Sequence, residues 1–153
     1  MHWKTKTFYK LINLELYNIL QLRNEVFVVE QNCIYQDADG NDDKATHIFL
    51  KDKHEIVTYL RIFKPGDYFE NAAIGRIVTH PDYRTNGYAI EAILKAINHI
   101  TNGWHERFIE ISAQKHLKNY YNRLGFQQIS DEYLEDGIPH IRMIYDKENL
   151  PFE

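Results

Sequence analysis

The segment Arg84–Ala89 has the residue types and the position to bind a phosphate-type anion. It follows a run of strand-forming residues, Ala72–Thr79, and it enters a run with helical spacing, so it precedes the N-terminus of a helix. The free N–H groups and the positive dipole end of such a terminus bind anions, and Gly87 and Ala89 let a phosphate approach closely. Neither the Gly-Lys-Ser/Thr loop nor the three-glycine dinucleotide pattern is present, so we predict a pyrophosphate-binding loop of another kind.

Three other groups have side chains suited to metal binding or covalent catalysis. The acidic run Asp37–Asp42 has its glycine at the fourth position and Ile48 at the twelfth, so we expect a solvated loop or one wall of an acceptor pocket instead of a calcium loop. The eight histidines lack the spacing of zinc ligands, so no metal is expected. Cys33 is either the nucleophile of a ping-pong mechanism or a small buried residue, and no base adjoins it in the sequence.

Hydrophobic periodicity predicts the elements that position these residues. One amphipathic helix covers residues 14–29, and a second begins after the phosphate loop and ends at Asn102-Gly103. The predicted apolar stripe of the second helix consists of Ile90, Ile93, Leu94 and Ile97. Strands are predicted over Thr46–Lys51, Glu55–Phe63, Ala72–Thr79 and Phe108–Ala113, followed by a helix over about Gln114–Leu124 and a hairpin of Phe126–Tyr133 and Ile138–Tyr145. This order predicts an α/β fold with a mixed sheet in one domain, residues 1–153.

The composition limits the classes of partner. Lys and Arg number 18 against 22 Asp and Glu, for a net charge of −4, and no basic run occurs, so nucleic acid is not the expected partner. A mildly acidic chain favours a cationic acceptor such as an amine. The single cysteine excludes an intramolecular disulfide. No stretch of about 20 apolar residues and no signal-like N-terminus is present, so we expect a cytoplasmic protein without a membrane partner.

Two ordered motifs resemble those of the GNAT acetyltransferase superfamily. Arg84-x-x-Gly87-x-Ala89 is similar to the Arg/Gln-x-x-Gly-x-Gly/Ala motif with which that family binds the pyrophosphate of coenzyme A. One helix and one strand downstream, Tyr121-x-x-x-Gly125-Phe126 resembles the second signature of the family. Further segments resemble the ElaA-like branch over nearly the whole chain, namely Leu22–Tyr35, Asp39–Asp42, Ile74–Arg76, Ala113–Leu117 and Glu135–Ile141. We therefore expect a single-domain GNAT fold, with a splayed central β-sheet flanked by helices.

The resemblance implies an acetyl-CoA-dependent N-acetyltransferase that acts directly on an amine of a small molecule or peptide. Acetyl-CoA would lie between the strands Ile74–Thr79 and Phe108–Ala113. The implied cofactor-binding residues are Ile77, Val78, Thr79, Arg84, Thr85, Asn86, Gly87, Tyr88, Ala89, Gln114 and Tyr121. A backbone N–H near Val78 would stabilise the developing oxyanion. Tyr121, with an unperturbed pKa of about 10, would protonate the departing CoA thiolate as the catalytic acid.

The general base is open between Glu110 and His140. An amine with a pKa near 10.4 must lose a proton for attack, and many relatives use a Glu on the strand where this chain has Arg76. Each candidate also has a structural interpretation, Glu110 as a paired carboxylate and His140 as a hydrogen-bonding residue of the hairpin. The candidate substrate-binding residues are Arg23, Glu30 and Arg76, of which the first two are equally suited to surface or partner contacts.

A non-catalytic acyl-CoA-binding or sensing module is the alternative function. Such a module would keep the phosphate loop without the transfer chemistry. Tyr121 favours the enzyme, whereas the missing glutamate on the first motif strand favours the alternative. The acceptor cannot be read from the sequence, because acceptor pockets vary within one fold. The tyrosine-rich C-terminal hairpin is a candidate surface for a homodimer.

Overall fold

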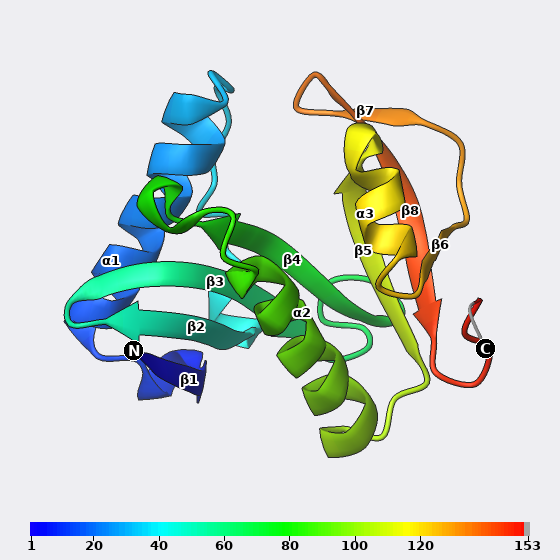
Figure 1. Cartoon of the computed structure of the whole chain (residues 1–153), viewed down its shortest axis with the longest axis horizontal. Coiled ribbons are helices and arrows are strands. Elements are labelled where there is room, and N and C mark those ends of the chain that lie inside the picture. Colours follow the sequence, from blue (N-terminus) through cyan, green and yellow to red (C-terminus); the bar gives the residue numbers. More distant parts are fainter. Residues whose placement is uncertain (152–153) are drawn as a thin grey trace.

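A mixed sheet of eight strands forms the centre of the protein (Figure 1). The computed structural model describes residues 1–151. The strands are β1 His2–Thr7, β2 Thr46–Asp52, β3 Glu55–Phe63, β4 Ala72–Thr79, β5 Phe108–Gln114, β6 Phe126–Gln128, β7 Tyr133–Glu135 and β8 Ile138–Asp146. Their order is β1-β2-β3-β4-β5-β8-β6, with β7 also paired to β8. Among the strand pairs within residues 1–151, only the central pair, β4 with β5, is parallel.

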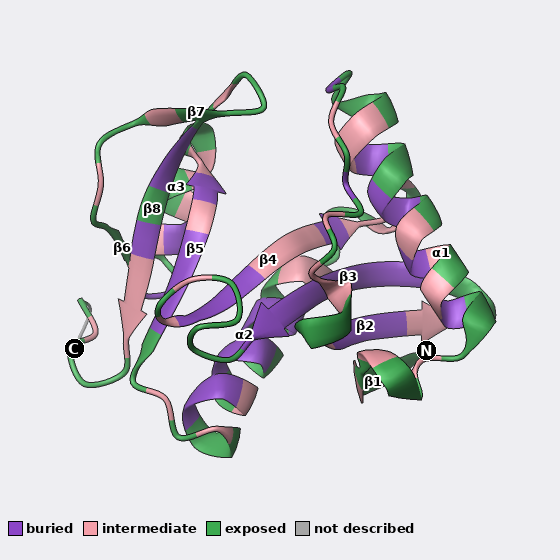
Figure 2. Cartoon of the chain, turned by 180° about the vertical axis from the view of Figure 1, so that it is seen from behind, coloured by how far each residue is buried: buried purple, intermediate pink, exposed green. Residues whose placement is uncertain are grey.

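Three helices and several short helical segments surround this sheet. The helices are α1 Asn13–Arg23, which continues as the π-helical η2 Asn24–Glu30, α2 Tyr88–Asn98, which continues as η5 His99–Gly103, and α3 Lys118–Asn122. The remaining segments are the 3₁₀ turns η1 Phe8–Lys10, η3 Asp42–Lys44, η4 Pro81–Tyr83 and η6 Lys115–Leu117. In Figures 1 and 2, α1 lies on one face of the sheet and α2 on the opposite face.

The alternation of side chains along the strands explains the two core layers. Residues of β2 that point one way, such as Ile48, pack with Ile93 of α2, whereas Phe49 packs with Ile19 of α1. Since successive strand residues face opposite sides, β2 and β3 bury both faces and are purple along most of their length in Figure 2. The sheet therefore holds α1 and α2 in fixed positions on either side of β4.

The parallel pairing of β4 and β5 is short, and this opens the sheet in its middle. Only two residue pairs join the strands, Ala72 with Ile109 and Ala73 with Glu110. A β-bulge in β4 then follows opposite β3, where Arg76 adopts a left-handed φ of 54°. Beyond these pairs β4 and β5 diverge toward the top of Figure 1. The splayed central sheet expected from the sequence is therefore present.

The predicted strands β2 to β5 are confirmed to within one residue, but the helices differ from expectation. The buried stripe of α2 consists of Ala92, Ile93, Ala96 and Ile97, so the predicted stripe was wrong at two positions. Ile90 and Leu94 are 40% and 53% exposed, because the two alanines let the other face of α2 approach the sheet. The helix predicted over Gln114–Leu124 is only η6 and α3, and the polar strand β1 was not predicted.

Two buried arginines bind the acidic loop before β2 to the rest of the domain. Arg23, which is 0% exposed, contacts Asp37 at 2.7 Å and Asp42 at 2.8 Å. Arg61, which is 1% exposed, contacts Asp39 at 2.6 Å and the same Asp42 oxygen at 2.8 Å. Burial raises the pKa of Asp39 and Asp42, but hydrogen bonds from the arginines outweigh it and hold both pKa values below their usual range. The loop is fixed by ion pairs and is not a solvated loop.

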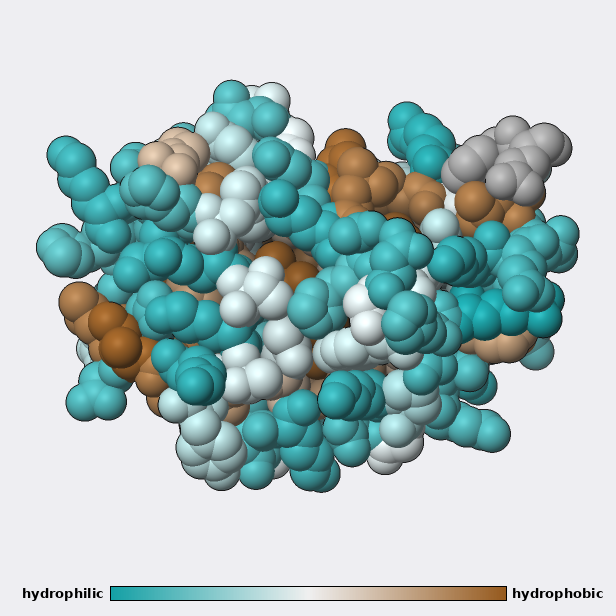
Figure 3. Space-filling model, turned by 90° about the horizontal axis from the view of Figure 1, so that it is seen from below, coloured by the Kyte–Doolittle hydropathy of each residue, from teal (hydrophilic) through white to brown (hydrophobic). Residues whose placement is uncertain are grey.

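The visible surface is mainly polar. Seen from below in Figure 3, hydrophilic residues cover most of this face, and hydrophobic residues form small separate patches. Small patches of this kind are normal for a globular domain. Within residues 1–151, no helix combines the length and the apolar character that a membrane span requires.

The acidic loop predicts a loss of stability in acid. Because the folded pKa values of Asp39 and Asp42 are depressed, their stabilisation is present above the unfolded pKa of about 3.9 and is lost as pH falls toward the folded values. We expect Asp39→Asn to lower the free energy of unfolding near neutral pH and to flatten its decline between about pH 4 and pH 2. Urea titrations across this pH range measure both effects. The exposed Asp43→Asn is the control and should follow the unmodified protein; a parallel decline in Asp39→Asn contradicts this account.

Candidate active site

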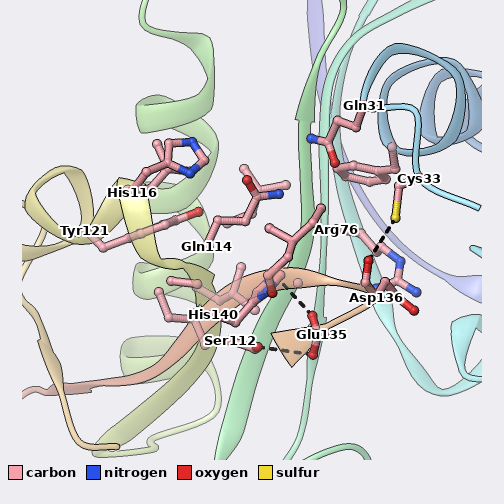
Figure 4. Close-up of a pocket in the computed structure, with 18 of the residues that line it drawn as sticks. Gln31, Cys33, Arg76, Ser112, Gln114, His116, Tyr121, Glu135, Asp136 and His140 are labelled. Atoms are coloured by element: carbon pink, nitrogen blue, oxygen red, sulfur yellow. Dashed lines mark hydrogen bonds and ion pairs between the residues drawn. The ribbon is translucent and has the colours of Figure 1, made fainter. Parts of the chain in front are cut away.

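A cavity of about 280 Å³ occupies the opening between β4 and β5 (Figure 4). Residues Ile74–Ile77 of β4 and Ile111–Gln114 of β5 form its two long walls. The α3 region closes one side, and the segment after η2 together with the β7–β8 turn closes the other. Because the strands are unpaired here, polar backbone edges face the cavity and are available to a ligand.

Tyr121 of α3 presents a buried phenol to this cavity. Its ring packs edge-on against Tyr120 and Phe126, and only 8% of the residue is exposed. In Figure 4 its hydroxyl points into the cavity toward Gln114, and it makes no hydrogen bond to any residue within 1–151. Burial, with a smaller contribution from Tyr120, raises the pKa of Tyr121 above its usual value. The phenol is therefore a protonated donor at neutral pH, aimed at a space that a ligand can fill.

The predicted phosphate loop lines a second cavity, between β4 and the N-terminus of α2. Thr85 and Gly87 have left-handed φ values of 68° and 78°, which turn the chain sharply into the helix. The first helical bond runs from the Glu91 N–H to the Gly87 carbonyl at 3.1 Å, so the earlier N–H groups of α2 have no helical acceptor. The residues around this cavity are Thr79, Tyr83, Arg84, Thr85, Gly87, Tyr88, Ala89, Ile90 and Tyr120. Their arrangement fits a diphosphate group.

Asn86 shapes this loop from within, and Tyr120 was not predicted to lie beside it. The Asn86 side-chain amide donates to the carbonyls of Tyr83 at 3.0 Å and Arg84 at 3.2 Å. Tyr120 reaches the loop from α3, next to Tyr121, so adjacent residues of one short helix line both cavities. On β4, Ile77 lines the first cavity and Thr79 lines the second. The two cavities are therefore neighbouring parts of one groove.

Glu30 contacts the phosphate loop instead of the acceptor end of the groove. Both its oxygens accept from Arg84, at 2.7 and 2.9 Å, and both side chains are about two-fifths exposed. The Arg84 hydrogen bonds outweigh the smaller effect of burial and lower the pKa of Glu30. The predicted role of Glu30 in acceptor binding is corrected, because the residue lies across the groove from the loop and pairs with its arginine.

Val78 faces away from the cavity, which corrects its predicted role as a cofactor-binding residue. It pairs with Tyr59 of β3, its carbonyl accepts from Thr58 Oγ1 at 2.9 Å, and its side chain packs in the α1 core layer. Backbone groups of successive strand residues point to opposite edges. The residues on either side of Val78, Ile77 and Thr79, therefore present their backbone to the open edge of β4.

Arg76 and Arg23 have different environments although both were predicted to bind the acceptor. Arg76 sits at the bulge of β4, lines the cavity and is about one-fifth exposed. Its Nε lies 2.8 Å from Asp37 Oδ1 as an ion pair without hydrogen-bond alignment, and its Nη2 donates to the Asp37 carbonyl at 3.1 Å. Arg23 is fully buried, does not line the cavity and holds the other oxygen of Asp37. Arg23 is thus a structural residue and no substrate can reach it.

The two candidate bases, Glu110 and His140, lie differently relative to the cavity. Glu110 is 1% exposed, lies outside the cavity and binds Arg142 through both oxygens at 2.9 and 3.0 Å, so its predicted catalytic role is corrected. His140 lines the cavity. Its Nδ1 lies 2.7 Å from the Ile138 carbonyl, which can only accept, so Nδ1 carries a proton. Its Nε2 lies 3.3 Å from a carboxylate oxygen of Glu135.

The β7–β8 turn contributes residues that the sequence did not identify. Glu135 accepts from Ser112 Oγ at 3.3 Å as well as facing His140. Cys33 Sγ donates to the Asp136 carbonyl at 3.5 Å and joins the turn to the segment after η2. Cys33 is buried, and within residues 1–151 no basic side chain forms a hydrogen bond with its thiol. The turn itself was predicted, but its approach to Cys33 depends on the folded chain.

One surface group of residues, Glu55, His80 and Asp82, has ligand atoms within 4.8 Å of one another. His80 Nε2 lies 3.0 Å from Glu55, and His80 Nδ1 accepts from the Asp82 N–H at 3.1 Å. Both ring nitrogens are therefore already bound by protein groups. The cluster lies outside both cavities described above.

Comparisons with known proteins agree with this geometry. A family model described as an acetyltransferase (GNAT) domain matches residues 14–147. Protein ElaA of Escherichia coli strain K12 is 39% identical over 145 residues, 94% of this chain and 95% of that protein. The crystal structure of an acyl-CoA N-acyltransferase from Pseudomonas aeruginosa has a TM-score of 0.88 at 37% identity and covers 95% of this chain and 99% of that chain. Escherichia coli ElaA has a TM-score of 0.87 at 36% identity, with coverage of 95% and 100%. The chain therefore belongs to the GNAT family of acyl-CoA-dependent N-acyltransferases and, within it, to the ElaA-like branch.

Proposed function

We propose that this protein transfers an acetyl group from acetyl-CoA directly to an amine of a small molecule or peptide. The observation that carries the proposal is the position of the unbound Tyr121 hydroxyl in a groove that also leads to the phosphate loop. A cavity of about 280 Å³ must hold both the acyl group and the amine, which favours a short acyl group such as acetyl.

The groove offers a separate set of atoms to each part of the cofactor. The open backbone edge at Ile77 and Thr79 pairs with the pantetheine arm like an added strand. The pyrophosphate-binding residues are Arg84, Thr85, Asn86, Gly87, Tyr88 and Ala89. Gln114 points its amide into the cavity, where it can hydrogen-bond the thioester end of the cofactor. Acetyl-CoA supplies an activated thioester, and the acceptor supplies the attacking nitrogen. The groups that move protons and stabilise charge belong to this chain.

Tyr121 and His140 hold the protons of the transfer. The acceptor nitrogen bonds to the acetyl carbonyl carbon, and the carbon–sulfur bond breaks. Tyr121 donates its proton to the departing sulfur, while the Ile77 N–H at the open edge stabilises the negative charge on the carbonyl oxygen. His140 Nε2 takes the proton that the amine loses, directly or through water, and Glu135 at 3.3 Å stabilises the resulting imidazolium. An acceptor that arrives as an ammonium ion loses two protons in all: one passes to solvent through His140 and the other restores the Tyr121 phenol. The products are therefore the amide, the CoA thiol and one proton.

Removing the Tyr121 hydroxyl should slow the chemical step. We expect Tyr121→Phe to lower kcat at least about tenfold with little change in the affinity for CoA, because the phenyl ring keeps the packing against Phe126. Release of CoA thiol from acetyl-CoA over a panel of amines and lysine peptides measures kcat. Tyr17→Phe is the matched control, since Tyr17 is 67% exposed on α1. Tight binding of acetyl-CoA by the unmodified protein, without turnover of any amine, would contradict the enzymatic function and support an acyl-CoA-sensing module.

The Glu30–Arg84 pair predicts competition between the carboxylate and the pyrophosphate. Since both oxygens of Glu30 occupy the Arg84 guanidinium, removing the charge frees this group for the cofactor. We expect Glu30→Gln to tighten CoA binding by up to about fivefold, within the range of exposed ion pairs, and Arg84→Ala to weaken it. Calorimetric titration at low ionic strength measures both affinities. Glu25→Gln, exposed one turn earlier on η2, should have no effect; weaker binding by Glu30→Gln contradicts the competition.

A further inference from the structure

The cavity wall opposite Tyr121 carries more negative than positive charge. In Figure 4, Tyr121 and His116 lie on one side of the cavity, whereas Arg76, Cys33 and Asp136 lie on the other. The β7–β8 turn places the side chains of Glu135 and Asp136 at this wall. The ionisable residues that line the whole cavity are Arg76, His116, Glu135, Asp136 and His140. Arg76 is thus the only permanent cation among them.

The charge of Arg76 is already balanced within the protein. Asp37 contacts it with both its side chain at 2.8 Å and its carbonyl at 3.1 Å, and Asp39 lies 3.6 Å away. The Tyr35 ring covers the guanidinium at 5.6 Å. Asp37 is 1% exposed and is itself fixed by Arg23, so this contact cannot open without disrupting the buried ion pairs. Arg76 therefore has little capacity to bind a carboxylate on the acceptor.

The two carboxylates have no comparable partner. Within residues 1–151, Glu135 contacts only His140 and Ser112 through its oxygens, and no Lys or Arg pairs with Glu135 or Asp136. The Cys33 thiol donates to the backbone carbonyl of Asp136, so this contact does not involve the Asp136 carboxylate. About half of the Glu135 side chain is exposed, so the charge is accessible from the groove.

We propose that the acceptor is an alkylamine with a second cationic group, which Glu135 and Asp136 bind, and that the site rejects amines with a carboxylate in that position. The inference rests on the proposed N-acetyltransferase function. Attraction of the second cation by two carboxylates that no Lys or Arg neutralises within residues 1–151 selects diamines, and repulsion of an anion excludes amino acids. The reacting nitrogen then lies between this wall and Tyr121, and His140 beside Glu135 receives its proton.

Three acceptors of equal chain length test the inference. Cadaverine, pentylamine and δ-aminovalerate share a five-carbon amine and end in a cation, a methyl group and a carboxylate. We expect kcat/KM with acetyl-CoA to fall in this order, with at least about tenfold between the first and the last. The preference for cadaverine over pentylamine should also shrink as salt rises, because screening weakens attraction between exposed charges.

Substitution of the carboxylates gives a readout that structural damage would not produce. In Glu135→Gln with Asp136→Asn, the ratio of kcat/KM for cadaverine to pentylamine should approach one, whereas damage lowers both values together. Asn tolerates the left-handed φ of 51° at position 136, so the turn is retained. Glu70→Gln, an exposed carboxylate outside the cavity, is the matched control and should keep the full ratio.

Failure of this inference is distinguishable from failure of the proposed function. Equal kcat/KM for the three acceptors, or a preference for δ-aminovalerate, would overturn the diamine assignment and leave the N-acetyltransferase intact. An unchanged ratio in the double variant would likewise overturn it. Transfer to no amine at all would count against both proposals.

Discussion

Pairing between β4 and β5 ends after two residue pairs, because the bulge at Arg76 turns β4 away from its neighbour. Every part of the groove depends on this interruption of the sheet. Unpaired backbone groups in a partly buried place are costly unless they find a partner. The interruption therefore leaves the edge at Ile77 and Thr79 ready for an extended ligand, and it separates α2 from α3 far enough to admit one. A continuous parallel pairing would satisfy the backbone and close the site.

The buried ion pairs stabilise this interruption. A left-handed conformation at a residue other than glycine costs about 1–2 kcal/mol. Arg76 adopts this conformation at the bulge. Asp37 holds the Arg76 side chain in place and is itself held by Arg23. Buried ion pairs of this kind often add little net stability but fix one arrangement of the chain. The same contacts neutralise Arg76, so the network that supports the bulge also leaves Glu135 and Asp136 to set the charge of the cavity wall opposite Tyr121.

Local patterns in the sequence predicted the strands and the loop before α2, because strand alternation and a loop before a helix are encoded by neighbouring residues. Tyr121 was identified through the family resemblance. The orientation of Val78 was not predictable in this way, since the register of β4 against Tyr59 includes the bulge. Glu135 was predicted as part of the hairpin turn and of the segment that resembles the ElaA-like branch, but not as a site residue. Its position beside His140 arises from the fold of β7 on β8. Glu110 was a reasonable candidate from its strand, but only the packed structure shows Arg142 bound to it. Local sequence therefore located the residues that line the β4–α2 end of the groove better than those at the β7–β8 turn.

The central claim is that the opening between β4 and β5 is the acyl-CoA site, and amide hydrogen exchange followed by NMR tests it most directly. With saturating acetyl-CoA, the account predicts slower exchange of the Ile77 and Thr79 amides and of those from Thr85 to Ile90. The amides of β1, at the far edge of the sheet, should be unchanged. Protection confined to other regions, with the open edge of β4 exchanging as fast as in the free protein, would contradict the account.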